Sequence, residues 1–89
     1  MADKFQIEYR SSVVKDLKLI DNKYRRLILD KIHRLSTAPI GKGSKKIDVR
    51  KNRYRIRVGI YRIIYQVNFL EHIITIEVIR HRKDAYRRK

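Results

Sequence analysis

The 89-residue sequence predicts an α+β domain in which two N-terminal helices pack on one face of a mostly antiparallel sheet of about four strands. Three observations support this prediction. Apolar residues recur at helical spacing in the first half of the chain, and they alternate with polar residues in the second half. A proline and two glycines separate the halves. This length accommodates one domain, which covers residues 1–89.

Apolar periodicity defines the N-terminal elements. Alternating apolar and polar residues at 5–9 predict a short strand. A serine at 11 or 12 offers an N-cap oxygen to a first helix, whose apolar residues recur as far as Ile20. Asp21-Asn22 can cap a second amphipathic helix. We expect that helix to end near residues 36–37, ahead of the helix-stopping Pro39.

The rest of the chain is predicted to form strands. Residues 38–46 form a loop by composition, since a proline, two glycines and a serine are gathered there. A short edge strand is expected at 47–49. Three longer strands are expected at 54–58, 61–67 and 73–79, where β-branched and aromatic residues are frequent.

The charge of the chain indicates a polyanionic partner. Lys and Arg number 24 against 9 Asp and Glu, which gives a formal net charge of +15. Such an excess favours nucleic acid or an acidic protein as the partner. The absence of cysteine excludes disulfides, zinc ribbons and thiol nucleophiles. No apolar run approaches the roughly 20 residues that span a bilayer. No signal-peptide core opens the sequence, so we expect a cytoplasmic protein without a membrane partner.

The turn at Gly59-Ile60 determines which side chains share a face of the sheet. Glycine in the first of two turn positions favours a type II′ turn, which pairs Arg57 with Arg62 and Arg55 with Ile64. Directly paired residues lie on the same face, so one face is basic. The opposite, apolar face carries Tyr54, Ile56, Val58, Tyr61, Ile63, Tyr65 and Val67.

A second hairpin, with Leu70-Glu71 as its turn, leads to the same division of faces. This register pairs Tyr65 with Ile76. Toward the other end of the hairpin it predicts pairs of Ile63 with Val78, Ile64 with Glu77 and Arg62 with Ile79. A slip of one residue would exchange the two faces.

Arg55, Arg57 and Arg62 should therefore crowd one open face. Opposed like charges destabilise a sheet, so folding alone does not explain this arrangement. A phosphate would relieve the repulsion through charge-assisted and often bidentate hydrogen bonds. The alternative is that Glu77 and solvent satisfy the guanidinium groups. We prefer the phosphate, because one carboxylate is too few for three arginines.

The basic C-terminal segment should leave the last strand close to Arg62. Basic neighbours favour the neutral, proton-accepting form of His81, although an exposed tail histidine is as often inert. Tyr86 could orient a phosphate, stack on a base or pin the segment to the sheet. The three histidines have no metal-ligand spacing, and we predict neither a metal nor a cofactor.

One reaction suits a basic site of this kind. The sequence has no carboxylate motif for two magnesium ions or for glycoside hydrolysis, and no Ser-His-Asp signature. In RNA, the 2′-hydroxyl can attack its own adjacent phosphate while cationic groups stabilise the negative charge that develops. General acid and base groups then handle two protons.

Three segments form a specific pattern: YRIRVG at 54–59, YRIIYQV at 61–67 and VIRHRKDAYR at 78–87. Together they resemble the RelE/ParE superfamily of bacterial and archaeal toxins, and the likeness covers nearly the whole chain. The resemblance implies a toxin of a type II toxin–antitoxin pair with a RelE-like β-α-α-β-β-β fold. It also implies an endoribonuclease that enters the ribosomal A site, cuts mRNA there without a metal and so inhibits translation.

Matched position by position, the resemblance implies roles for five side chains. Arg55 and Arg57 match two basic residues on the sheet. Arg62 matches the arginine that contacts the scissile phosphate. Arg82 matches a tail arginine proposed as proton donor, and Tyr86 matches a tyrosine that orients the substrate.

Two departures from the family pattern affect these assignments. The best-known bacterial pattern has lysines at the positions of Arg55 and Arg57, and arginine is a poor base because its pKa exceeds about 12. His81 thereby becomes the better candidate for the general base. Arg80 stands where many members have glycine, which leaves the course of the tail open. Further RNA contacts are expected from Lys45, Lys46, Arg53, Lys83 and Arg87.

The resemblance also implies partners. Family antitoxins wrap the toxin with an acidic helix plus an extended segment and mask its basic groove, and the complex reaches operator DNA only through the antitoxin. The substrate partners are the ribosome and mRNA. Two other interpretations stay open: a ParE-like inhibitor of DNA gyrase, which needs no catalytic groups, and a relative that binds RNA or ribosomes without cleaving.

Overall fold

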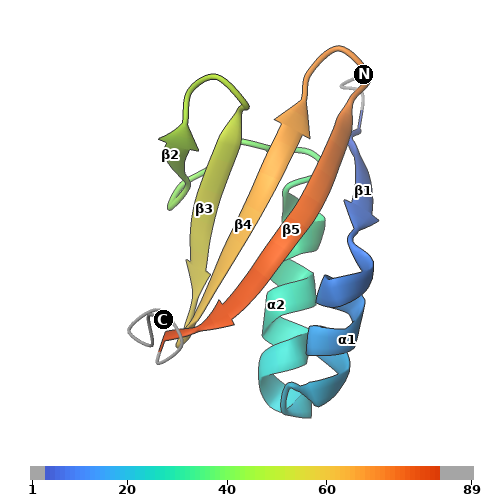
Figure 1. Ribbon diagram of the computed structural model, residues 1–89, viewed down its shortest axis with the longest axis vertical. Helices are drawn as coiled ribbons and strands as arrows, with labels where there is room; N and C mark the ends of the chain where they lie inside the picture. Colours follow the sequence, from blue (N-terminus) through green and yellow to red (C-terminus); the bar gives the residue numbers. More distant parts are fainter. Residues whose placement is uncertain (1–3, 83–89) are drawn as a thin grey trace.

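Two helices and five strands make up the computed structural model of the chain, which describes residues 4–82 (Figure 1). Their bounds are β1 (Gln6–Tyr9), α1 (Ser11–Leu19), α2 (Asn22–Arg34), β2 (Lys45–Asp48), β3 (Arg53–Val58), β4 (Tyr61–Asn68) and β5 (Ile73–His81). The predicted α+β class with its two N-terminal helices is confirmed. The sheet has five strands rather than about four.

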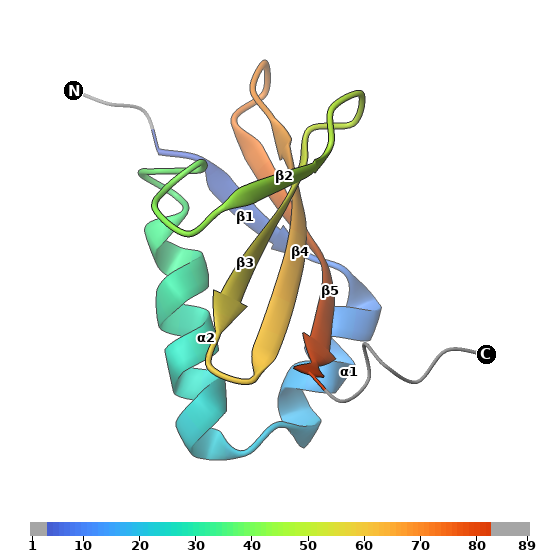
Figure 2. The ribbon, with the colours of Figure 1, turned by 90° about the vertical axis from the view of Figure 1, so that its left-hand side faces the viewer.

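The strands form one sheet in the order β1-β5-β4-β3-β2. Its hairpins are antiparallel, whereas β1 runs parallel to β5, with Gln6 opposite Ile73. Both helices and strands β2, β3 and β4 lie between β1 and β5 in sequence, and they supply the long connection that such a parallel pair requires. At the opposite edge, β2 extends along β3 only as far as the pair of Lys45 with Arg55. The second half of β3 is therefore an open edge beside α2 (Figure 2).

The helix ends differ slightly from the predicted ones. Arg10, rather than a serine, occupies the N-cap position of α1, and Asp21 occupies that of α2 without a side-chain hydrogen bond. Helix α2 ends at Arg34, earlier than expected, because the N–H groups of Leu35 and Ser36 bond to carbonyls three residues back. Neither helix of residues 4–82 is long and apolar enough to cross a bilayer.

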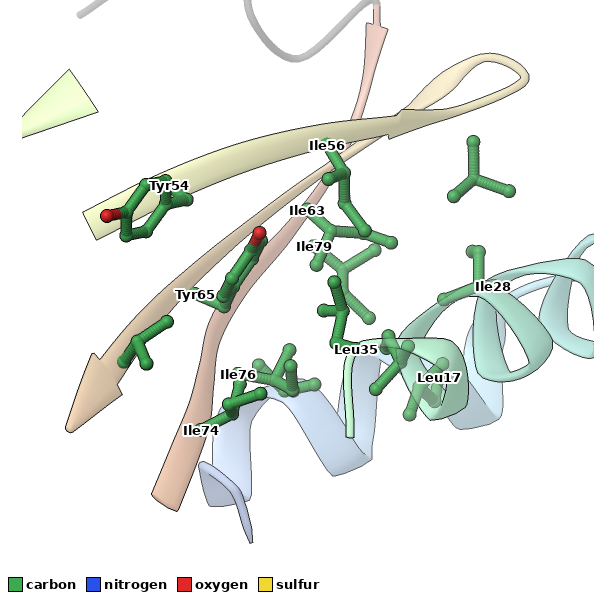
Figure 3. Packing of buried hydrophobic residues seen from close by; sticks show 14 of the residues in the cluster. Leu17, Ile28, Leu35, Tyr54, Ile56, Ile63, Tyr65, Ile74, Ile76 and Ile79 are labelled. Carbon is green, nitrogen blue, oxygen red and sulfur yellow. The ribbon is translucent and has the colours of Figure 1, made fainter. Parts of the chain in front are cut away.

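Both helices pack on the face of the sheet that was predicted to be apolar (Figure 3). Ile28 and Ile32 of α2 are fully buried, as is Val13 of α1. The sheet contributes Tyr54, Ile56, Val58, Ile63, Tyr65, Val67, Ile74, Ile76 and Ile79 to the same core. Burial of this face leaves the opposite face without a covering helix, and the basic side chains of β3 and β4 lie there.

Candidate nucleic-acid interface

Three arginines from neighbouring strands form one row across the open face of the sheet. A type II′ turn requires a positive φ at its first central residue but not at its second. The turn between β3 and β4 meets both conditions, because Gly59 has a φ of 59° and Ile60 has no positive φ. This turn places Arg57 opposite Arg62, which confirms the predicted register. Arg80 of β5 lies opposite Arg62 on the other side. Because adjacent strands are about 4.8 Å apart, the row extends over roughly 10 Å.

Arg57, Arg62 and Arg82 line one pocket of about 290 Å³ beside the β3–β4 turn. Gly59-Ile60 and Tyr61 complete its lining. The backbone N–H of Arg82 donates a hydrogen bond of 2.6 Å to the Ile60 carbonyl oxygen, which ties the end of β5 to the turn. The structure thus brings together three of the six residues that were predicted to be catalytic.

The guanidinium groups of this pocket lack acidic partners within the part of the chain that the structure describes. No carboxylate of residues 4–82 lies within 4.0 Å of Arg57, Arg62 or Arg82. Three positive charges that no carboxylate of residues 4–82 neutralises repel each other around this pocket. A phosphate would accept hydrogen bonds from all three and relieve the repulsion, so the pocket is suited to an anion.

Glu77, the carboxylate considered as an alternative partner of these arginines, is engaged elsewhere. Its side chain is only 4% exposed and accepts hydrogen bonds from Arg10 at 2.9 Å and from Nε of Arg53 at 2.7 Å. Arg53 also lies 3.8 Å from Asp48. Arg53, predicted as an RNA contact, is therefore held by two carboxylates.

A β-bulge at Glu77 changes the register predicted for the end of β5. Tyr65 pairs with Ile76 as expected, but β5 then contains one extra residue. The observed pairs beyond this point are Ile64 with Val78, Ile63 with Ile79 and Arg62 with Arg80. The predicted pairs of Ile63 with Val78, Ile64 with Glu77 and Arg62 with Ile79 are wrong, because the extra residue shifts the strand by one position.

Arg80 is the site residue that the sequence reasoning missed. The sequence contains a signal for it: Val78 and Ile79 are adjacent apolar residues, and a regular strand cannot bury both on one face. The bulge allows Ile79 to follow Ile76 into the core. Arg80 then lies on the open face, where it is exposed and beside Arg62.

Arg55 does not line the pocket that contains Arg57, Arg62 and Arg82. It borders a second hollow of about 250 Å³, which is lined by Lys31, Gly43, Lys45, Arg55 and Arg57. Lys45, a predicted RNA contact, is therefore beside Arg55. Lys46, another predicted contact, places its ammonium group 5.6 Å from the ring centroid of Tyr54. Arg57 lines both hollows and connects them.

His81 lies on the helix-facing side of the sheet, opposite the arginine row. It pairs with Tyr61, and the two ring centroids are 5.2 Å apart. It also borders a hollow with Asp16 and Leu19 of α1. His81 thus lies on the opposite face of the sheet from Arg62, near which the basic segment was expected to leave β5, and its assignment as general base stays a prediction. The bulge is the reason for this position, since it reverses the faces of the residues that follow it on β5.

Three predicted site residues lie outside the described residues: Lys83, Tyr86 and Arg87. Among residues 4–82, His, Asp and Glu side chains form no group of three that could ligate a metal ion.

Comparison with known proteins connects this arrangement to a toxin family. A family model described as the ParE toxin of type II toxin–antitoxin systems matches residues 7–86. A relative from Methanocaldococcus jannaschii, which carries the name of toxin RelE1, is 34% identical to this chain. That match covers 94% of this chain and 97% of the relative.

Solved structures share the fold. The archaeal RelE–RelB complex from Pyrococcus horikoshii matches with a TM-score of 0.79 at 25% identity, over 89% of this chain and 96% of that one. The RelB–RelE antitoxin–toxin complex from Methanococcus jannaschii matches with a TM-score of 0.72 at 32% identity, over 89% and 94%. The isolated RelE toxin of E. coli, at 15% identity, is similar in fold alone, with a TM-score of 0.76 over 86% and 83%.

Proposed function

The chain belongs to the RelE/ParE superfamily of type II toxin–antitoxin toxins, and from this premise we propose that it is a RelE-like mRNA endonuclease. It cleaves mRNA in the ribosomal A site, without a metal ion, and thereby inhibits translation. The single observation that supports this proposal best is the pocket lined by Arg57, Arg62 and Arg82, in which three guanidinium groups face no carboxylate of residues 4–82.

The proposed reaction is an internal transfer within the RNA. The 2′-oxygen forms a bond to the adjacent phosphorus, and the bond from phosphorus to the 5′-oxygen of the next nucleotide breaks. The 2′-hydroxyl loses a proton and the leaving 5′-oxygen gains one, so the products are a 2′,3′-cyclic phosphate and a 5′-hydroxyl. The negative charge on the phosphate oxygens increases at the crowded, five-coordinate stage.

The arginines of the pocket stabilise this developing negative charge. Arg57 and Arg62 donate hydrogen bonds to the non-bridging oxygens, and Arg82 donates from the segment after β5. Such fixed donors stabilise the transition state because they require no reorganisation when the charge develops. Guanidinium groups are poor bases, and His81 lies on the other side of the sheet. Electrostatic stabilisation is therefore the contribution that we assign to the described residues.

An antitoxin is the second partner that we propose. Two of the structurally similar proteins were crystallised as RelE–RelB complexes, and both match at 25% identity or more. An acidic partner that contributes a helix and an extended segment would neutralise a chain of net charge +15 and cover its basic pocket. Operator DNA would be reached only through this complex.

Translation of a defined mRNA in a cell extract, with 5′ ends mapped afterwards, tests the activity. We expect the wild-type chain to cut within codons, and Arg62→Ala to cut about 10²- to 10³-fold more slowly, because it removes one transition-state donor. Arg26→Ala is the matched control, since Arg26 is exposed on α2 and lines neither basic hollow. Thermal unfolding of both variants establishes that they are folded.

Purified DNA gyrase and purified ribosomes are assayed in parallel. Intact mRNA together with inhibited supercoiling would replace this proposal by a ParE-like gyrase inhibitor. Intact mRNA together with ribosome binding would identify a non-catalytic relative. Equal cleavage by Arg62→Ala and Arg26→Ala would contradict the role assigned to Arg62.

A further inference from the structure

We propose that the hollow between α2 and the open edge of β3 is a second phosphate-binding subsite, which holds single-stranded RNA next to the scissile linkage. Lys31, which lies on α2 and was not predicted as a site residue, is its distinguishing contact. The inference rests on the proposed function, because it concerns the RNA that enters the pocket of Arg57, Arg62 and Arg82.

The subsite is built from three elements. Lys31 comes from α2, Lys45 from β2, and Arg55 and Arg57 from β3. Lys31 and Arg55 are half-buried, so their stems are partly immobilised before a ligand binds. In the described part of the chain, no carboxylate lies within 4.0 Å of any of these four cations. Four positive groups around one hollow of about 250 Å³ favour an anion of high charge density.

Shared residues make the basic hollows continuous. Arg57 lines both the pocket of Arg62 and the hollow of Lys31. Lys31 also lines a third hollow of about 210 Å³, together with Lys42 and other residues of the 38–44 loop and α2. Together the three hollows form a basic track. This track passes around the edge of β3 beyond the end of its pairing with β2, so no strand obstructs it. It leads from the open face of the sheet toward α2.

The loop beside the subsite is held by partly buried hydrogen bonds. The Tyr65 hydroxyl donates to the Pro39 carbonyl oxygen at 2.7 Å and lies 3.1 Å from Oγ of Ser44. The Gly41 N–H also donates to that Oγ, at 3.0 Å. Burial raises the pKa of Tyr65 above its usual 10.0, so the hydroxyl remains a donor at neutral pH. Gly43 has a φ of 92° and open space where a Cβ would stand, so a ligand can approach its backbone.

A single strand of RNA fits this track better than the other anionic macromolecules. The track turns around the edge of a sheet, whereas duplex nucleic acid is stiff over about 50 nm. A polynucleotide presents one negative charge at every nucleotide, which matches a continuous series of cations. An acidic protein would need carboxylates in a similarly regular array, and we treat that partner as an outcome of the test.

Fluorescence anisotropy with a 2′-O-methylated oligouridylate of about 12 nucleotides tests the subsite, because this probe cannot be cleaved. Binding is measured between about 50 and 200 mM NaCl. We expect Lys31→Gln to weaken binding roughly fivefold and to reduce the slope of log K against log salt by about 0.7, the value for one lost phosphate contact. Lys15→Gln, an exposed position on α1, is the matched control. Lys31→Arg should restore the affinity.

Equal affinities and slopes for Lys31→Gln and Lys15→Gln with this probe would overturn the subsite. The RNA subsite would also be overturned if Lys31→Gln weakened binding of an acidic peptide but not of RNA. If the wild type still cleaves mRNA in the extract, these results remove the subsite alone and leave the proposed function intact.

Discussion

One carboxylate, Glu77, joins three separate parts of the chain. It lies in the middle of β5 and is bonded by Arg10, which precedes α1, and by Arg53, which begins β3. A buried carboxylate is destabilising unless it is paired, and here two guanidinium groups supply the pairing. Glu77 is itself the extra, unpaired residue of the β-bulge, because Ile76 pairs with Tyr65 and Val78 with Ile64. We infer that the cluster stabilises the bulge and therefore the positions of Ile79 and Arg80.

Replacement of Glu77 by glutamine should destabilise the fold by about 2–3 kcal/mol. The variant keeps the shape of the side chain but leaves Arg10 and Arg53 facing a neutral amide in a buried place. Urea unfolding measures the loss. Asp30→Asn provides the control, because Asp30 pairs with Arg34 on the exposed surface of α2 and should change the stability by less than about 0.5 kcal/mol. Equal effects of the two substitutions would contradict a structural role for Glu77.

At the scale of elements, the β3–β4 hairpin aligns the arginine row. Its turn requires a positive φ at Gly59, and the Tyr24 ring of α2 packs 3.4 Å from the place where a Cβ would stand. The hairpin end is therefore constrained by its own backbone and by a helix. β5 adds Arg80 and Arg82 to the same region, because the bulge and the hydrogen bond from Arg82 to Ile60 set its course.

The substitution Gly59→Ala should cost about 1–2 kcal/mol of unfolding free energy. An L side chain is strained at a φ of 59°, although its Cβ would meet Tyr24 only at an ordinary contact distance of 3.4 Å. Chemical denaturation measures this cost. Gly41→Ala should be nearly neutral, because Gly41 has no positive φ and its Cβ would make an ordinary contact of 3.5 Å. A Gly59→Ala chain as stable as Gly41→Ala would show that the turn tolerates another conformation.

For the whole molecule, charge is the dominant feature. The chain carries a formal net charge of +15, and residues 4–82 form only four ion pairs shorter than 4.0 Å. Most of the basic side chains therefore repel one another across a small fold. This repulsion lowers stability, and it also attracts polyanions from a distance. Binding of RNA or of an acidic partner should relieve it.

Salt should consequently stabilise the isolated chain. The melting temperature should rise by several degrees between about 0.1 and 1 M NaCl, since the screening length falls from about 10 to about 3 Å. Thermal unfolding followed by circular dichroism measures the shift. A non-ionic solute at equal osmolality controls for exclusion from the protein surface. A melting temperature that falls with salt would mean that the Glu77 ion pairs outweigh the general repulsion.

Local sequence patterns were sufficient to predict much of the fold and part of the candidate site. Helical periodicity predicted both helices, and the residue pattern predicted β1, β3, β4 and β5 with bounds within two residues of those observed. The Gly59-Ile60 turn predicted that Arg57 would lie opposite Arg62. The motifs of β3, β4 and the end of β5 led to the correct toxin superfamily. These features depend on neighbours in the sequence, so the sequence by itself determined them.

Only the tertiary structure determined which face of the sheet each side chain at the end of β5 occupies. The bulge places Arg80 in the arginine row and His81 on the helix side, and alternation alone indicated the reverse. The adjacent Val78 and Ile79 are the local signal for the bulge, whereas Glu77 within it is paired with side chains 67 and 24 positions away in sequence. The parallel pairing of β1 with β5 and the position of Lys31 beside Arg55 likewise result from packing between distant segments.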